Sequence, residues 1–149
     1  LASGLECRVI FLDHLSILLS GLDGDERRMI DSTMTRLRSL VERTGITLFL
    51  VSHLRRSNSD SNSHEEGGRV SLGQLRGSHS ISQISDCVIA LERDQQSEDS
   101  NNTTTVRVLK NRHSGEVGVA TRLDYDLSTC KFYENKTTEQ PEFDPTVDF

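Results

Sequence analysis

The first half of the chain alternates between apolar and polar blocks, and each apolar block predicts one element. Residues 8–13 run Arg-Val-Ile-Phe-Leu-Asp, so four apolar residues lead directly into an acid. A continuous apolar run of this kind is typical of a strand that is buried on both faces of a parallel sheet. Residues 46–51, Ile-Thr-Leu-Phe-Leu-Val, have the same character and end just before Ser52 and His53. They predict a second buried strand.

The segment between these strands has the periodicity of a helix. Between residues 25 and 44, apolar side chains recur at spacings of three and four, at positions 29, 30, 34, 37, 40 and 41. That spacing predicts an amphipathic helix, with Asp25 as its N-cap and Gly45 as its left-handed stop. A strand, a helix and a strand of these lengths form a βαβ unit, so we expect the two strands to be parallel.

The second half of the chain is more polar and predicts shorter elements. Residues 55–71 are poor in apolar side chains and predict a long loop. A short helix is expected near residues 72–84, followed by a third apolar strand at residues 87–91. Two β-rich stretches then predict a hairpin that turns through Ser114 and Gly115.

The β-rich stretches are residues 103–109 and 117–123, and residues 131–133 predict a last edge strand. The expected fold class is therefore α/β, with a largely parallel sheet, flanking helices and a β-hairpin near the C-terminus. We expect residues 1–133 to form one domain and residues 134–149, which hold both prolines, to be an acidic disordered tail.

The distribution of charge matters more than its total for the choice of partner. The formal net charge is −6, which by itself argues against nucleic acid. Residues 134–149 hold five acidic residues and one lysine, a net charge of −4, so the remainder carries only −2. Local basic patches in that remainder can still bind phosphate groups.

Cysteine spacing and hydropathy exclude other classes. The three cysteines, Cys7, Cys87 and Cys130, are widely spaced and form no Cys-x-x-Cys pair. This argues against a disulfide framework or a zinc site and favours a reducing compartment. No run of about 18 apolar residues is present, so we expect no membrane partner.

Two polar side chains follow the buried strands and are candidates for chemistry. Asp13 ends the first strand, where open α/β sheets place their ligands and where nucleotide hydrolases carry the acid that holds Mg²⁺. His53 follows the second strand, where a donor could contact a γ-phosphate. Each residue also has a purely structural interpretation, because many buried strands end in aspartate and a histidine at a strand end can simply be hydrogen-bonded.

Basic residues at loop and strand ends form a second group of candidates. Arg55 and Arg56 open the polar loop and suit binding to a phosphate backbone, or they are a solvated loop start. Arg93 ends the third strand, and Arg112 precedes the glycine turn of the hairpin. An arginine before such a turn is held out from the body, as an arginine finger is, although a surface arginine beside a turn looks the same.

The order of these segments resembles the C-terminal half of the RecA-like hexameric replicative helicases, and among them the phage primase-helicases and the mitochondrial Twinkle type. The resemblance covers about residues 5 to 133. The segments that carry it are Val9-Ile10-Phe11-Leu12-Asp13-His14, Val51-Ser52-His53-Leu54-Arg55, His64-Glu65-Glu66-Gly67, Leu75-Arg76-Gly77-Ser78, Asp86 to Arg93, and Lys110-Asn111-Arg112-His113-Ser114-Gly115.

The resemblance implies a role for each candidate residue. Asp13 resembles the Walker B acid that holds Mg²⁺, His53 the phosphate sensor and Arg112 the arginine finger. Nucleotide-binding residues implied in the same way are Gln83, Arg93 and Tyr125. Implied DNA-binding residues are Arg55, Arg56, Arg76, Gly77 and Ser78.

The resemblance also implies what the protein binds. We expect an ATP-dependent 5′-to-3′ DNA helicase that forms a hexameric or heptameric ring on single-stranded DNA, with Mg²⁺ and ATP or dTTP. The terminal residues Asp148 and Phe149 resemble a tail that docks on the replicative DNA polymerase. The implied location is the cytoplasm of an infected bacterium, or alternatively the mitochondrial matrix.

One part of the family pattern is absent from these 149 residues. There is no Gly-x-x-x-x-Gly-Lys-[Ser/Thr] loop, which in the family precedes the Walker B strand, so we expect this chain alone not to hydrolyse ATP. Two other functions share these features: a recombinase-type RecA-like ATPase, and a RecA-like scaffold that binds DNA or a partner without catalysis.

Overall fold

The computed structural model describes residues 6–20, 24–55, 64–75, 79–98 and 100–135. These residues belong to two compact units. The first unit comprises Leu1–Ser59 and Val70–Val88, and the second comprises Asp60–Arg69 and Ile89–Phe149. Along the chain, residues therefore belong first to the first unit, then to the second, then to the first again and finally to the second.

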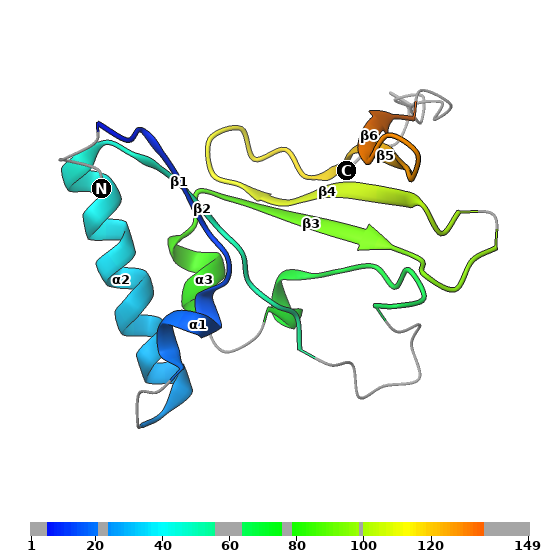
Figure 1. Ribbon diagram of the computed structural model, residues 1–149. Coiled ribbons are helices and arrows are strands. Elements are labelled where there is room, and N and C mark those ends of the chain that lie inside the picture. Colours follow the sequence, from blue (N-terminus) through cyan, green and yellow to red (C-terminus); the bar gives the residue numbers. More distant parts are fainter. Residues whose placement is uncertain (1–5, 21–23, 56–63, 76–78, 99, 136–149) are drawn as a thin grey trace, which may run out of the picture. The chain divides into compact units, whose positions relative to one another are not determined.

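A parallel pair of strands organises the first unit. Strand β1 (Val9–Leu12) and strand β2 (Thr47–Leu50) pair in parallel from Val9↔Thr47 to Leu12↔Leu50. Helix α2 (Glu26–Thr44) connects them and is the long helix beside the pair in Figure 1. The predicted βαβ unit is thus confirmed.

Both ends of α2 have the caps that the sequence predicts. The Asp25 carboxylate accepts hydrogen bonds from the backbone N–H groups of Arg27 and Arg28, at 2.9 and 3.4 Å. Gly45 ends the helix with φ of 67°, a left-handed conformation that glycine adopts without a Cβ penalty, and its N–H donates to the Val41 carbonyl.

The core of the first unit lies between its helices. Leu15 and Leu19 come from helix α1 (Leu15–Leu19), and Ile30 and Met34 come from α2. Leu75 and Ile81 from the later part of the chain complete the cluster. Sequence reasoning did not anticipate α1, because its five residues are too few to show a helical period.

The prediction of a single helix near residues 72–84 is wrong, because the structure has two separate elements there. A 3₁₀ turn, η1 (Leu72–Gln74), ends at Leu75, whose ψ of 130° is extended, and α3 (His79–Ile84) follows separately. A reciprocal capping box between Ser71 and Gln74 stabilises the turn. Residues 76–78 lie outside the described part of the chain.

The second unit is built around a four-stranded sheet with the order β3-β4-β5-β6. Its strands are β3 (Cys87–Arg93), β4 (Thr103–Asn111), β5 (Gly118–Asp126) and β6 (Lys131–Glu134). The expected hairpin and edge strand are confirmed, since β4 pairs with β5 and β5 with β6, both antiparallel. The expectation of a largely parallel sheet therefore holds for β1 and β2 only, and β3, whose first two residues belong to the first unit, pairs with β4 instead.

None of the described helices is both long and apolar enough to cross a membrane.

Candidate functional site

The carboxyl ends of β1 and β2 bring Asp13 and His53 to one place. The ladder continues past both strands, because the Val51 N–H donates to the Leu12 carbonyl at 2.9 Å and the Leu15 N–H donates to the Val51 carbonyl at 3.0 Å. These bonds hold the segment from Asp13 to Leu15 beside the segment that leads to His53. Both candidate side chains are exposed, as a ligand contact requires.

Two histidine rings are in contact at the carboxyl ends of these strands. The His14 and His53 rings lie 4.2 Å apart at their centroids and meet edge to face at 71°. His14 Nδ1 is buried, and no hydrogen-bond partner for it occurs among the described residues. Sequence reasoning did not single out His14, although its place directly after Asp13 was visible. Its ring packs edge to face against the His53 imidazole.

The donor set at this corner fits one ligand position of a magnesium ion. Mg²⁺ in nucleotide sites is held by one or two carboxylates, with phosphates and water as the other ligands. Asp13 offers one exposed carboxylate, and no cluster of three or more metal-ligating side chains occurs in the described part of the chain. Asp13 therefore suits a metal that a nucleotide carries in, rather than an ion held in a protein cage.

The two segments expected to bind DNA are joined by backbone hydrogen bonds. Leu54 and Leu75 form an isolated antiparallel bridge, and the Arg55 N–H donates to the Gln74 carbonyl at 2.8 Å. The exposed Arg55 thus lies beside the chain that leads directly to Arg76. The other expected DNA contacts, Arg56, Arg76, Gly77 and Ser78, lie outside the described residues.

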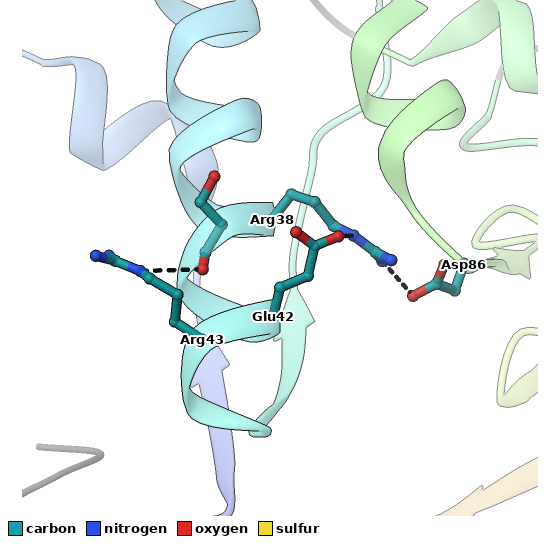
Figure 2. Close-up of polar contacts among 5 residues, drawn as sticks. Arg38, Glu42, Arg43 and Asp86 are labelled. Atoms are coloured by element: carbon teal, nitrogen blue, oxygen red, sulfur yellow. Dashed lines mark hydrogen bonds and ion pairs between the residues drawn. The ribbon is translucent and has the colours of Figure 1, made fainter.

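An arginine of α2 joins that helix to the segment after α3 (Figure 2). Arg38 Nη1 lies 2.7 Å from Asp86 Oδ2, and Arg38 Nε lies 2.8 Å from Glu42 Oε1. These carboxylates, Glu42 first and then Asp86, raise the pKa of the Arg38 guanidinium. Gln83 is exposed on α3, two residues before that anchored segment begins. The spacing of Arg38 and Glu42 was visible in the sequence, but the contact with Asp86 was not.

The remaining candidates belong to the second unit. Arg93 ends β3 and donates from Nε to the Asn101 carbonyl at 2.5 Å. Tyr125 on β5 is half-buried, with its ring 4.9 Å from that of Phe132 on β6. A hydrogen bond with Cys130, aided by desolvation, raises the Tyr125 pKa. The site residues therefore divide between the units: Asp13, His53 and Gln83 in the first, and Arg93, Arg112 and Tyr125 in the second.

Arg112 occupies the turn that the sequence predicts. It follows β4 and is exposed, and the turn after it is held by Asn111. The Asn111 Oδ1 accepts from the His113 and Ser114 N–H groups at 3.1 and 3.3 Å, and Gly115 closes the turn with φ of 77°. These hydrogen bonds stabilise the turn that directly follows Arg112.

The second unit also contains an open polar cavity of about 550 Å³ that sequence reasoning missed. Two of its lining residues form a bidentate ion pair, in which Arg107 Nε and Nη2 both lie within 3.1 Å of the Glu92 carboxylate. Glu92 raises the Arg107 pKa. The cavity is lined by Gly67, Glu92, Arg93, Asp94, Ser100, Thr103, Thr105, Arg107, Arg122 and Asn135.

The chain belongs to the family described as the DnaB-like helicase C terminal domain, whose family model matches residues 2–134. A curated relative, the DNA helicase/primase of Enterobacteria phage T3, is 44% identical over 128 residues. That match covers 85% of this chain but only 22% of the relative, so the chain spans about a fifth of its length. The expected resemblance to replicative helicases is thus confirmed.

Two solved structures support the same fold. The first, described as an ATPase domain, is 23% identical with a TM-score of 0.64, and the match covers 83% of this chain and 43% of that one. The second, "The Structure Of A DnaB-Like Replicative Helicase And Its Interactions With Primase", is 21% identical with a TM-score of 0.67. It covers 83% of this chain and 30% of that chain. At these identities the likeness concerns the fold, and the expected α/β fold class is confirmed.

Proposed function

We propose that this chain is part of the motor domain of an ATP-driven DNA helicase that moves 5′ to 3′ on single-stranded DNA during replication. One observation carries the proposal: a member of the DnaB-like helicase family holds an exposed carboxylate, Asp13, and an exposed imidazole, His53, at the adjoining ends of two parallel strands. That edge of a parallel sheet is where α/β proteins bind their ligands.

The nucleotide chemistry follows from the side chains at this edge. A bound Mg²⁺ would offset the negative charge that develops on the phosphate oxygens. Asp13 contributes a carboxylate oxygen to that ion, and His53 donates a hydrogen bond to the γ-phosphate. The substrate is ATP or dTTP, and Gln83 couples its state to the DNA-binding segments through α3.

Residues of the second unit act on the nucleotide of a neighbouring subunit in the same proposal. Arg112 is the arginine finger, because its turn holds it exposed at the end of β4. Arg93 contacts phosphate or the subunit interface, and Tyr125 covers the base. This arrangement requires a ring, which we propose to be a homo-hexamer or heptamer.

The DNA path lies along the bridged segments around Arg55 and residues 76–78. Support comes from the Leu54–Leu75 bridge, which ties the two segments together, so that they can move as one body on a phosphate backbone. Arg56, Arg76, Gly77 and Ser78 complete this surface in the proposal.

The proposed setting is a phage replisome in the cytoplasm of an infected bacterium. The identity with the phage T3 protein supports this location. Asp148 and Phe149 are proposed to dock on the replicative DNA polymerase, with the acidic tail supplying electrostatic attraction and the terminal ring an anchor. A primase activity of the same polypeptide is part of the proposal as well.

The test is the Asp13→Asn variant of the full-length protein. The change is nearly isosteric but removes the charge that holds the metal, so ATP hydrolysis on single-stranded DNA should fall by about 10²-fold or more. Glu98→Gln, which neutralises another exposed acid, is the matched control and should keep full activity. Wild-type turnover in Asp13→Asn, with circular dichroism unchanged, would refute the metal-binding role.

Mixed rings extend this test to Arg112. Subunits with Asp13→Asn and subunits with Arg112→Ala are each expected to be inactive alone. When the two are mixed, some interfaces combine an intact Asp13 with an intact Arg112 of the neighbouring subunit, so partial activity should return. If no mixing ratio restores hydrolysis, Arg112 does not act across the interface.

A further inference from the structure

One face of the sheet in the second unit is polar and hollowed. Glu92 of β3 and Arg107 of β4 lie on this face, because their side chains form an ion pair across the two strands. Thr105 lies on the same face of β4, two residues before Arg107, and it is paired directly with Arg122 of β5. These four side chains line the open cavity of about 550 Å³. Such a cavity admits several side chains, since one water molecule takes about 30 Å³.

The lining of this cavity carries more positive than negative charge. Its arginines are Arg93, Arg107 and Arg122, and its carboxylates are Glu92 and Asp94, which gives a net charge of +1. Both carboxylates are already engaged. Glu92 accepts from Arg107 at 2.9 to 3.1 Å, and Asp94 Oδ1 accepts from two backbone N–H groups of the turn after it, at 2.9 and 3.0 Å. The cavity therefore suits an anion better than a cation.

Arg122 is the lining cation that is available to such an anion. Its side chain is exposed, and among the residues that the structure describes it forms no hydrogen bond or ion pair. Arg107 differs, because Glu92 neutralises it, and Arg93 donates from Nε to the Asn101 carbonyl. A guanidinium presents a planar fork of donors that fits a carboxylate or a phosphate. The geometry therefore leaves one binding position for an anionic group that is not part of the sheet.

The chain that continues from the cavity carries suitable anions. Asn135 lines the cavity and is fixed there, because its N–H donates to the Arg122 carbonyl and its Nδ2 to Asp124 Oδ2, both at 2.8 Å. Residues 136–149 follow directly and lie outside the described part of the chain. They contain four carboxylates and one lysine, a net charge of −3. Glu139 is four residues after Asn135, so an extended chain carries it at most about 14 Å from that anchor.

We propose that the acidic segment 136–149 docks in this cavity and binds Arg122 through one of its carboxylates. The short tether favours the contact, because attachment through Asn135 gives the segment an effective concentration in the mM range. A contact that would be weak between separate molecules is then formed most of the time. The opposite net charges of the segment and the lining add a longer-range attraction. That attraction falls with salt, since the Debye length is only about 3 Å at 1 M.

The contact has a consequence for the partner of the tail. The same acidic segment is proposed above to dock on the replicative DNA polymerase, and a carboxylate that binds Arg122 is not available to a basic surface of that partner. The cavity therefore holds the segment until the polymerase displaces it. This consequence rests on the proposed function, whereas the contact with Arg122 requires neither polymerase nor nucleotide and can be tested without them.

Arginine-selective modification of the full-length protein with phenylglyoxal, measured by mass spectrometry, tests the proposal. Arg36 of α2 is exposed as well and serves as the reference in the same sample. The test variant replaces three acids of the segment by their amides: Glu139→Gln, Glu142→Gln and Asp144→Asn. Its ratio of Arg122 to Arg36 modification should exceed that of the wild type by about threefold or more, because no tethered carboxylate covers the guanidinium. Equal ratios in the two proteins would overturn the proposal.

Two further samples identify the occupant of the cavity. Lys136→Gln changes the same segment but keeps all its acids, so it is the matched control and should keep the low ratio of the wild type. About 1 M salt should raise the ratio of the wild type to that of the test variant. Protection of Arg122 that persists in the test variant and appears only with single-stranded DNA would assign the cavity to nucleic-acid phosphate instead, and it would also overturn the proposal.

Limited proteolysis measures the same contact from the side of the segment. Chymotrypsin cleaves after Phe143, and cleavage follows the population in which the segment is free. Arg122→Gln should therefore speed this cleavage in the full-length protein by about threefold, since the docked population is lost. Arg36→Gln removes the same charge elsewhere and should leave the rate unchanged. Equal rates for the two variants would contradict the contact.

Discussion

At the scale of single residues, Glu92 and Arg107 form an ion pair that is largely shielded from solvent. The two side chains are 6% and 16% exposed, and both prongs of the guanidinium reach the carboxylate. A carboxylate that is buried without a cation loses its hydration and gains no attraction in return. The two hydrogen bonds from the guanidinium offset that loss. The pair joins residues on β3 and β4, so it also fixes the sheet at the point where the polar cavity opens.

Removing one partner should be costly. Glu92→Gln leaves the Arg107 guanidinium with a single neutral acceptor, and we expect the free energy of unfolding to fall by about 2 kcal/mol or more. Urea unfolding measures this directly. Glu116→Gln is the control, because Glu116 is exposed, and its effect should stay within about 0.5 kcal/mol. Equal stabilities for the two variants would mean that the ion pair contributes little.

The residues that could be predicted are those whose role is visible from their neighbours in the sequence. Asp13 and His53 could be found because each comes after an apolar run, and chain order alone places strand ends. The ion pair of Glu92 and Arg107 could not, because it depends on the lateral register of two strands. His14 was adjacent to a predicted residue, yet its contact with His53 depends on side-chain direction, which periodicity does not determine.

At the scale of elements, the Arg38–Asp86 ion pair joins α2 to the segment that follows α3. Arg38 binds two carboxylates, of which Glu42 lies one turn away on the same helix and Asp86 lies 48 residues away in the chain. The largest single cause of the raised pKa of Arg38 is its hydrogen bond to Glu42, followed by its hydrogen bond to Asp86. For folding we expect Asp86 to matter more, because a contact one turn apart also forms in partly folded helices and therefore cancels.

A pair of double-mutant cycles tests this ranking. One cycle combines Arg38→Ala with Asp86→Asn, and the other combines Arg38→Ala with Glu42→Gln. Both share the same arginine, so each is the matched control of the other. We expect the larger coupling free energy for Asp86, measured by urea unfolding, and a smaller one for Glu42. Coupling that is larger for Glu42 would show that α3 is held by its apolar contacts instead.

The elements that sequence reasoning placed well are those with caps or long periods. Helix α2 was predicted with both caps because Asp25 and Gly45 act locally. Helix α1 and the break at Leu75 were missed for the opposite reason. Each depends on tertiary contacts, such as the Leu54–Leu75 bridge, which draws Leu75 out of a helix. Short apolar segments take the conformation that their neighbours impose.

At the scale of the whole molecule, the sequence did not reveal the division into two units. The boundary expected at residue 134, where composition changes, stays a prediction, because residues 136–149 lie outside the described part of the chain. The crossings between the units after residues 59, 69 and 88 were not expected. Composition is uninformative at these crossings. The second crossing, for example, joins polar residues on one side to the buried Val70 on the other.

This interleaving predicts the behaviour of a nicked protein. A protease site placed between Arg55 and His64 would yield two pieces, both of which contain residues of the first unit. Leu15, Leu19, Ile30 and Met34 on the first piece pack with Leu75 and Ile81 on the second. We therefore expect the pieces to elute together in native size-exclusion chromatography and to separate in urea. Separation without denaturant would contradict the common core.

The same crossings impose an order on folding during synthesis. The first unit lacks Leu75 and Ile81 of its core until residues beyond 81 have left the ribosome, although all of β1, α2 and β2 is already present. Residues 64–67 emerge before that point, yet their partner Asp94 does not. Because domains generally fold as units during synthesis, we expect the first unit to be complete before the sheet of the second can close. Phe11 of β1 and Phe49 of β2, which are both exposed in the structure, are then already present on the nascent chain while the hairpin of β4 and β5 is still being translated.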